Sequence, residues 1–73
     1  MDDDLMEVDK AILVAIRSSR EPLSTYGIAK GANISWSTAN IHCYKLNSLG
    51  LITPRKQQSR FGQSKVLWQI RKR

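Results

Sequence analysis

The sequence predicts an α+β fold in which three helices are followed by a two-stranded antiparallel hairpin. Apolar residues recur at helical spacing in the first two thirds of the chain, and they alternate one by one near its end. The first period is typical of helices and the second of half-buried strands. The 73 residues contain no internal repeat and no low-complexity linker, so residues 1–73 are expected to form a single domain.

The first helix is expected over residues 5–18. Five apolar residues lie at offsets 0, 3, 7, 8 and 11, and so share one helical face: Leu5, Val8, Ile12, Leu13 and Ile16. Asp4 is the expected N-cap, and Glu7 completes a pair that resembles a capping box. The helix is expected to end before Pro22, because a residue that precedes proline avoids the helical region.

The second helix is expected over residues 25–30, with Ser24 as its N-cap. Ser24 is a strong candidate because its hydroxyl can accept a hydrogen bond from a backbone N–H of the first turn. Gly31 and Asn33 follow the helix, and both can adopt the left-handed conformation that a tight turn requires.

The third helix is expected over residues 36–49, between the N-cap Ser35 and the terminating Gly50. Its predicted buried stripe lies at offsets 0, 3, 4, 7 and 10: Ala39, His42, Cys43, Leu46 and Leu49. The opposite face is therefore expected to be exposed.

After residue 50 the pattern predicts two strands joined by a long basic hairpin. Leu51 and Ile52 open the first strand, and Pro54 restricts it to a sheet edge or a bulge. Val66, Trp68 and Ile70 alternate with their neighbours, as in a half-buried second strand.

The positive charge is concentrated after residue 21. The chain has 12 Lys and Arg against 6 Asp and Glu, a net charge of +6. All six acids lie within residues 1–21, whereas residues 22–73 carry nine bases and no acid. We interpret this pattern as that of a nucleic-acid binder rather than of a domain that uses charge only for solubility.

Several function classes are excluded. No apolar run approaches the roughly 18 residues of a membrane span, and a single cysteine, Cys43, indicates a cytoplasmic chain without an internal disulfide. His42 and Cys43 are adjacent and have no further Cys or His beside them, so no metal is expected. The small core and the distance of the acids from His42 argue against an enzyme and against any cofactor.

Four motifs together resemble small prokaryotic winged helix-turn-helix transcription regulators. Ala29 is the small residue at the helix crossing, and Asn33-Ile34 occupies the turn. Ser35-Trp36-Ser37-Thr38 opens the recognition helix in the family's manner, and residues 46–52 match the passage into the first wing strand. The compact size resembles regulators of archaea or of their viruses and plasmids. The family's C-terminal dimerisation helix is not expected, because the sequence ends almost at the second wing strand.

The resemblance implies a sequence-specific regulator of transcription that binds double-stranded DNA, with repression as its expected effect and the nucleoid as its expected location. The recognition helix, about residues 36–49, would enter the major groove, and the basic wing, about residues 55–65, would contact the backbone or the minor groove. The expected DNA-binding residues are Ser35, Trp36, Ser37, Thr38, Asn40, Ile41, Tyr44, Lys45, Arg55, Lys56, Arg60, Phe61 and Lys65.

The chemistry of these side chains supports DNA binding independently of the family. Asn40 can make a bidentate contact with adenine, and Ile41 can touch a thymine methyl group. Ser37 and Lys45 are further outward positions, whereas Ser35 and Thr38 suit phosphate contact near the helix start. Most phosphate affinity is expected from the basic residues of the wing, supplemented by residues outside it: Lys30, Arg71, Lys72 and Arg73.

The aromatic residues have alternative interpretations. Trp36 stacks on DNA or packs across the adjoining turn, and Tyr44 donates to phosphate or covers the core, the core being favoured. Phe61 enters the minor groove or folds back on the hairpin, the former being favoured. Trp68 is interpreted as core because it alternates with apolar neighbours.

The sequence is also compatible with two other functions, a winged-helix module that docks proteins and a non-specific architectural protein that binds DNA or RNA. Met6 and Val14 lie outside the main face of the first helix. They are expected to widen the core stripe, or else to form the contact of a homodimer through this helix.

Overall fold

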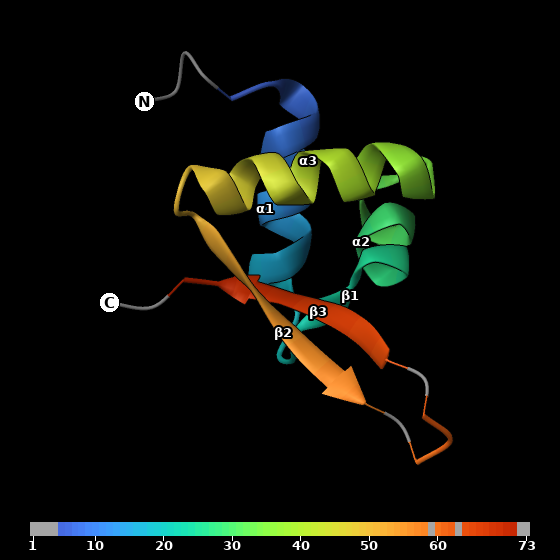
Figure 1. Ribbon diagram of the computed structural model, residues 1–73. Coiled ribbons are helices and arrows are strands. Elements are labelled where there is room, and N and C mark those ends of the chain that lie inside the picture. The colour runs from blue at the N-terminus through green and yellow to red at the C-terminus, as the bar shows by residue number, and fades with distance from the viewer. Residues whose placement is uncertain (1–4, 59, 63, 72–73) are drawn as a thin grey trace.

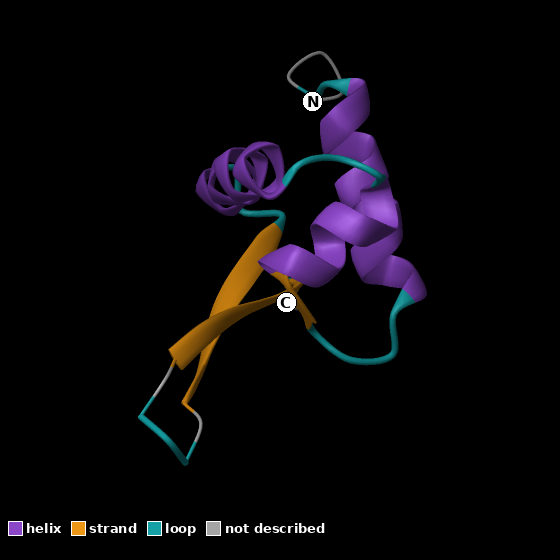
Figure 2. Ribbon diagram, turned by 90° about the vertical axis from the view of Figure 1, so that its right-hand side faces the viewer, coloured by secondary structure: helices purple, strands orange, loops and turns teal. Residues whose placement is uncertain are grey.

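The structure is a computed structural model that describes residues 5–58, 60–62 and 64–71. Its fold is α+β, as the sequence predicts. Three helices pack together at one end, and a long hairpin extends away from them (Figures 1 and 2). In chain order the elements are α1 (Glu7–Ser18), β1 (Leu23–Ser24), α2 (Thr25–Ala32), α3 (Trp36–Ser48), β2 (Ile52–Gln58) and β3 (Ser64–Ile70).

The sheet is antiparallel and has the strand order β1-β3-β2. Trp68 of β3 lies opposite Leu23 of β1 and Pro54 of β2. The sequence predicted only the two strands of the hairpin. The third strand, β1, was not predicted, because two residues are too few to show an alternating pattern. Pro54 lies on an edge strand, as expected for a residue that lacks a backbone donor.

Helix α1 begins two residues later than predicted. Its N-cap is Met6, whose backbone N–H donates to Asp9 Oδ2 over 2.7 Å. The expected N-cap Asp4 lies outside the described residues. The prediction therefore chose the wrong acid, because Asp9 at the third helical position is the one that satisfies a free N–H of the first turn.

The predicted N-caps of α2 and α3 are confirmed. Ser24 accepts from the N–H of Gly27 over 3.0 Å, and Ser35 accepts from that of Thr38 over 3.1 Å. Asn33 ends α2 in the left-handed conformation, with φ of 59°. Gly31 is part of the helix instead of the turn, and an added Cβ there would meet Ala15 of α1 at 3.4 Å.

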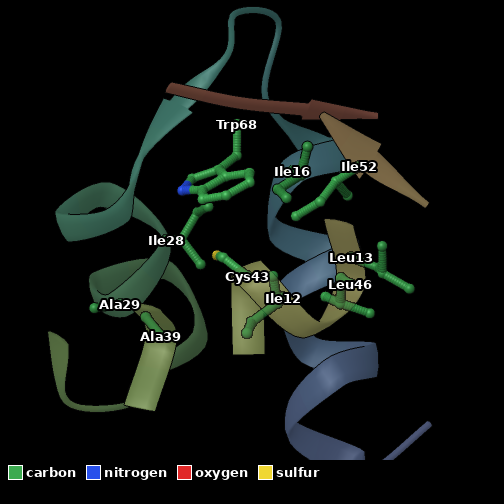
Figure 3. Packing of buried hydrophobic residues seen from close by; sticks show 10 residues of the cluster. All are labelled: Ile12, Leu13, Ile16, Ile28, Ala29, Ala39, Cys43, Leu46, Ile52 and Trp68. Carbon is green, nitrogen blue, oxygen red and sulfur yellow. The ribbon is translucent and has the colours of Figure 1, made fainter. Parts of the chain in front are cut away.

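The core lies between the three helices and the inner face of the sheet (Figure 3). Its buried apolar members are Ile12, Leu13, Ile16, Ile28, Ala29, Ala39, Cys43, Leu46, Ile52 and Trp68. Leu49 was expected in this set but is 44% exposed, because α3 ends at Ser48 and the chain turns at Gly50, where φ is +79°. His42 is only half-buried.

Trp68 lies at the centre of this core and joins the sheet to the helices. The side chain is 0% exposed, and its Nε1–H donates to Thr25 Oγ1 over 3.0 Å. The ring of Tyr44 meets it edge-on at 5.1 Å between centroids. The interpretation of Trp68 as core is confirmed, and Tyr44 covers the core as expected while remaining 50% exposed.

Candidate nucleic-acid interface

One face of α3 is open to solvent and carries most of the predicted helix contacts. Trp36 is 53% and Ile41 is 67% exposed. Ser37 between them is also exposed, whereas Asn40 is half-buried. This face presents a hydroxyl, an amide and apolar groups, which are the groups that can distinguish base edges in the major groove.

At the start of α3, two hydroxyls proposed for phosphate contact are engaged with each other. Ser35 Oγ donates to Thr38 Oγ1 over 2.9 Å while it accepts from the backbone N–H of Thr38. The hydroxyl of Thr38 keeps its own hydrogen and can still donate outward.

The basic side chains of the hairpin are exposed, and the hairpin itself projects from the three helices (Figure 2). Arg55 and Lys56 belong to β2, Lys65 belongs to β3, and Arg60 lies at the tip. Phe61, also at the tip, is 83% exposed. The structure therefore separates a nearly neutral helix face from a cationic hairpin. Lys72 and Arg73 lie outside the described residues.

Lys45 does not lie free on the exposed face of α3 as predicted. Its ammonium donates to Oδ2 of Asp9, which is 0% exposed. His42 Nδ1 donates to Oδ1 of the same carboxylate over 2.7 Å. Lys45 was expected to contact DNA, but its charge is used within the protein, where it ties α3 to the start of α1.

The Asp9 cluster, formed by Asp9 with Met6, His42 and Lys45, was missed because only Asp4 and Glu7 were considered at the start of the first helix. Asp9 falls at offset 4 from Leu5, on the same face as the apolar residues, and this signal is present in the sequence. Burial raises the pKa of Asp9, but the hydrogen bonds from Lys45, the backbone of Met6 and His42 outweigh it and hold that pKa below its ordinary value. The carboxylate is therefore ionised at neutral pH.

Neither Cys43 nor the other possible ligands indicate a metal site. Burial raises the pKa of the Cys43 thiol to about 12, so the group behaves as a small apolar side chain. Within the described ranges, no three His, Cys, Asp or Glu side chains gather closely enough to hold an ion. Over the same ranges, no helix is long and apolar enough to cross a membrane.

Met6 and Val14 are 55% and 60% exposed, so they do not widen the core stripe. A dimer contact through these residues of α1 stays a prediction.

Two neighbouring hollows lie on the surface beside Ser24, the last residue of β1. The aromatic hollow, about 610 Å³, is lined by Ser24, Thr25, Tyr26, Trp36, Asn40, Tyr44, Lys65 and Val66. The basic hollow, about 710 Å³, is lined by Glu21, Pro22, Leu23, Ser24, Arg55, Lys56, Gln57, Gln58, Lys65 and Leu67. Because Ser24 and Lys65 line both, the two hollows meet beside Lys65.

Comparison with known proteins shows the same fold in two solved structures. One is a possible transcriptional regulator from Methanosarcina mazei Go1, with a TM-score of 0.83 over 94% of this chain and 16% identity. The other is the DNA-binding protein BpsR of Bordetella bronchiseptica, studied for its regulation by 6-hydroxynicotinic acid, with a TM-score of 0.77 over 97% of this chain and 20% identity. This chain spans 58% and 52% of those two chains. No family model and no curated protein sequence matches it.

Proposed function

We propose that this chain is a winged helix-turn-helix domain that binds double-stranded DNA in a sequence-specific way and regulates transcription. The observation that carries the proposal is the exposed face of α3 beside a projecting cationic hairpin. The two proteins of the same fold, a possible transcriptional regulator and a DNA-binding protein, support it. Repression would follow if the bound domain blocks polymerase from a promoter.

In this proposal α3 reads bases in the major groove. Ser37, Asn40 and Ile41 share its solvent-facing side. The amide of Asn40 offers a donor and an acceptor together, and Ile41 offers apolar contact to a thymine methyl group. Because Lys45 is paired with Asp9, α3 contributes little charge to the interface, and its role is to distinguish sequences.

The hairpin supplies affinity that does not depend on sequence. Arg55, Lys56, Arg60 and Lys65 are exposed, and residues 22–73 contain no acid that could repel phosphate. Each cation that neutralises a phosphate releases counterions, which makes binding depend on salt. Selection of binding sites from random duplexes, followed by footprinting, tests the function. Enrichment of one motif is expected, whereas no enrichment would contradict sequence-specific binding.

Replacing Asn40 with alanine is expected to cost about 1–3 kcal/mol on the selected site, with little change on unrelated duplexes. The reason is that the lost amide contacts base edges and not the backbone. Fluorescence anisotropy titrations of both duplexes measure the difference. Equal weakening on both would show that Asn40 does not read sequence.

Replacing Arg60 with alanine is expected to weaken selected and unrelated duplexes alike, and to reduce the slope of log K against log salt by about one. Arg60 is exposed at the hairpin tip, so the folded state should be unaffected. Titrations at four salt concentrations give the slope. A loss confined to the selected site would assign base reading to the hairpin instead.

A further inference from the structure

The aromatic hollow is bordered by three aromatic rings, each of which is at least half exposed. Tyr26 is 63%, Trp36 is 53% and Tyr44 is 50% exposed, and the three come from α2 and α3. Exposed aromatic rings gathered around one hollow are unusual on a monomer and indicate a surface that another molecule covers.

The floor of the hollow is fixed by the packing beneath it. Tyr44 is seated edge-on against the buried Trp68, and Thr25 accepts a hydrogen bond from the same indole. Trp36 begins α3 directly after its N-cap Ser35. A ligand therefore meets one ring, that of Tyr44, which is already positioned, and this limits the conformational entropy lost on binding.

Charge around the hollow indicates what the ligand is. Lys65 lines it and continues into the basic hollow, where Arg55 and Lys56 add positive charge against a single acid, Glu21. The Nζ atom of Lys30 lies over the ring of Tyr26, 5.5 Å from its centroid, and adds another positive charge nearby. Aromatic rings beside a cationic path suit a chain of planar bases joined by phosphates.

Duplex DNA is not the natural occupant of this hollow, because its base faces are covered by their stacked neighbours. Only an unpaired nucleotide presents a free base face to an aromatic side chain. We propose that the aromatic hollow binds unpaired nucleotides, whose bases stack on Trp36 and Tyr26 while their phosphates lie along Lys65 and the basic hollow. This single-strand site goes beyond the duplex binding proposed above and does not rest on it.

The test uses the full chain and single-stranded (dT)12 with a 5′ fluorescein, followed by anisotropy in low salt. Trp36→Ala and Tyr26→Ala are each expected to weaken binding about 5- to 150-fold, the range for loss of one stacked base. Trp36→Phe keeps a ring and is expected to stay within about threefold of the parent. Leu49→Ala removes an exposed apolar side chain just beyond the C-terminal end of α3, outside both hollows, and should not change binding.

Two further measurements show whether a base stacks on Trp36 and whether the effect is confined to single strands. Trp36 is exposed and Trp68 is buried, so a bound base should quench the fluorescence of Trp36 only. If unlabelled (dT)12 quenches the tryptophan fluorescence of the parent but not that of Trp36→Phe, a base stacks on Trp36. A random 12-base-pair duplex, titrated against Tyr26→Ala, is expected to keep its affinity, because Tyr26 lines the aromatic hollow but is not among the expected duplex contacts.

The outcomes distinguish this proposal from the duplex function. Loss of (dT)12 binding in Tyr26→Ala with unchanged duplex binding supports the single-strand site, whether or not duplex selection enriches a motif. Equal loss on single strand and duplex in Tyr26→Ala overturns it, because the hollow would then be part of a general DNA face. Unchanged (dT)12 binding in both alanine variants also overturns it. If thymidine 5′-monophosphate alone binds as tightly as (dT)12, the hollow takes a small ligand and the proposal of a nucleic-acid strand fails.

Discussion

Replacing Trp68 with alanine is expected to lower the free energy of unfolding by about 3–5 kcal/mol. The side chain is 0% exposed, fills the space between the sheet and the helices, and its indole hydrogen bonds to Thr25 (Figure 3). A core of this size supplies only about 3–5 kcal/mol in total, so the variant should be largely unfolded at 25 °C. Circular dichroism and urea titrations in rising trimethylamine N-oxide measure the loss, because the osmolyte restores folding of a weakened chain.

The second tryptophan provides the matched control. Trp36 is 53% exposed, and its replacement by alanine is expected to change the free energy of unfolding by no more than about 0.5 kcal/mol. Trp68→Phe should be intermediate, because it keeps most of the apolar volume but leaves a small cavity and removes the donor to Thr25. Equal effects at the two tryptophans would contradict the central position of Trp68.

Replacing Asp9 with alanine is expected to lower the free energy of unfolding by about 3 kcal/mol, at the low end of the range for breaking a buried ion pair. The change leaves the Met6 N–H, His42 and Lys45 without their acceptor. The lysine side chain is 34% exposed and can turn towards water, which limits the cost. Glu7→Ala is the control on the same helix, since that side chain is 93% exposed, and it should change stability by less than about 0.5 kcal/mol.

The same carboxylate makes stability depend on acid pH. Its pKa in the folded state lies below the unfolded value of about 3.9, so the unfolded chain binds the proton more readily. The stabilisation is therefore present above the unfolded pKa and is lost as pH falls through the folded pKa. Urea midpoints measured at several pH values should fall less steeply in Asp9→Asn than in the parent. An unchanged acid profile would show that Asp9 is not the group responsible.

The parts of the fold that were predicted from the sequence are those governed by neighbouring residues. Ser24 and Ser35 were identified as N-caps because a cap bonds to an N–H only three residues away. The alternation around Trp68 identified β3 for the same reason. Local pattern is sufficient where the interaction itself is local.

The missed features depend on contacts between distant parts of the chain. Asp9 bonds to residues 33 and 36 positions further along, and β1 exists only because Leu23 and Ser24 pair with β3. For the interface, the sequence indicated the exposed side of α3 and the cationic hairpin, but not the ion pair that Lys45 forms with Asp9. The aromatic hollow also escaped notice, because Tyr26 joins Trp36 only through the packing of α2 beside α3.

The length of the hairpin can change in evolution independently of the core, because only its base is attached to the rest of the sheet. Strand β3 pairs with β1 only at Leu67 and Trp68, but with β2 along all seven residues of Ser64–Ile70. Among the described residues, Val66 is the one nearest the tip that packs against the core, so beyond its pair with Lys56 the hairpin can lengthen or shorten without disturbing that packing. Inserting two residues into each strand preserves which side chains face which side and extends the hairpin by about 7 Å. The reach of the cationic arm can thus drift by insertion and deletion, while the packing that folds the chain stays under separate selection.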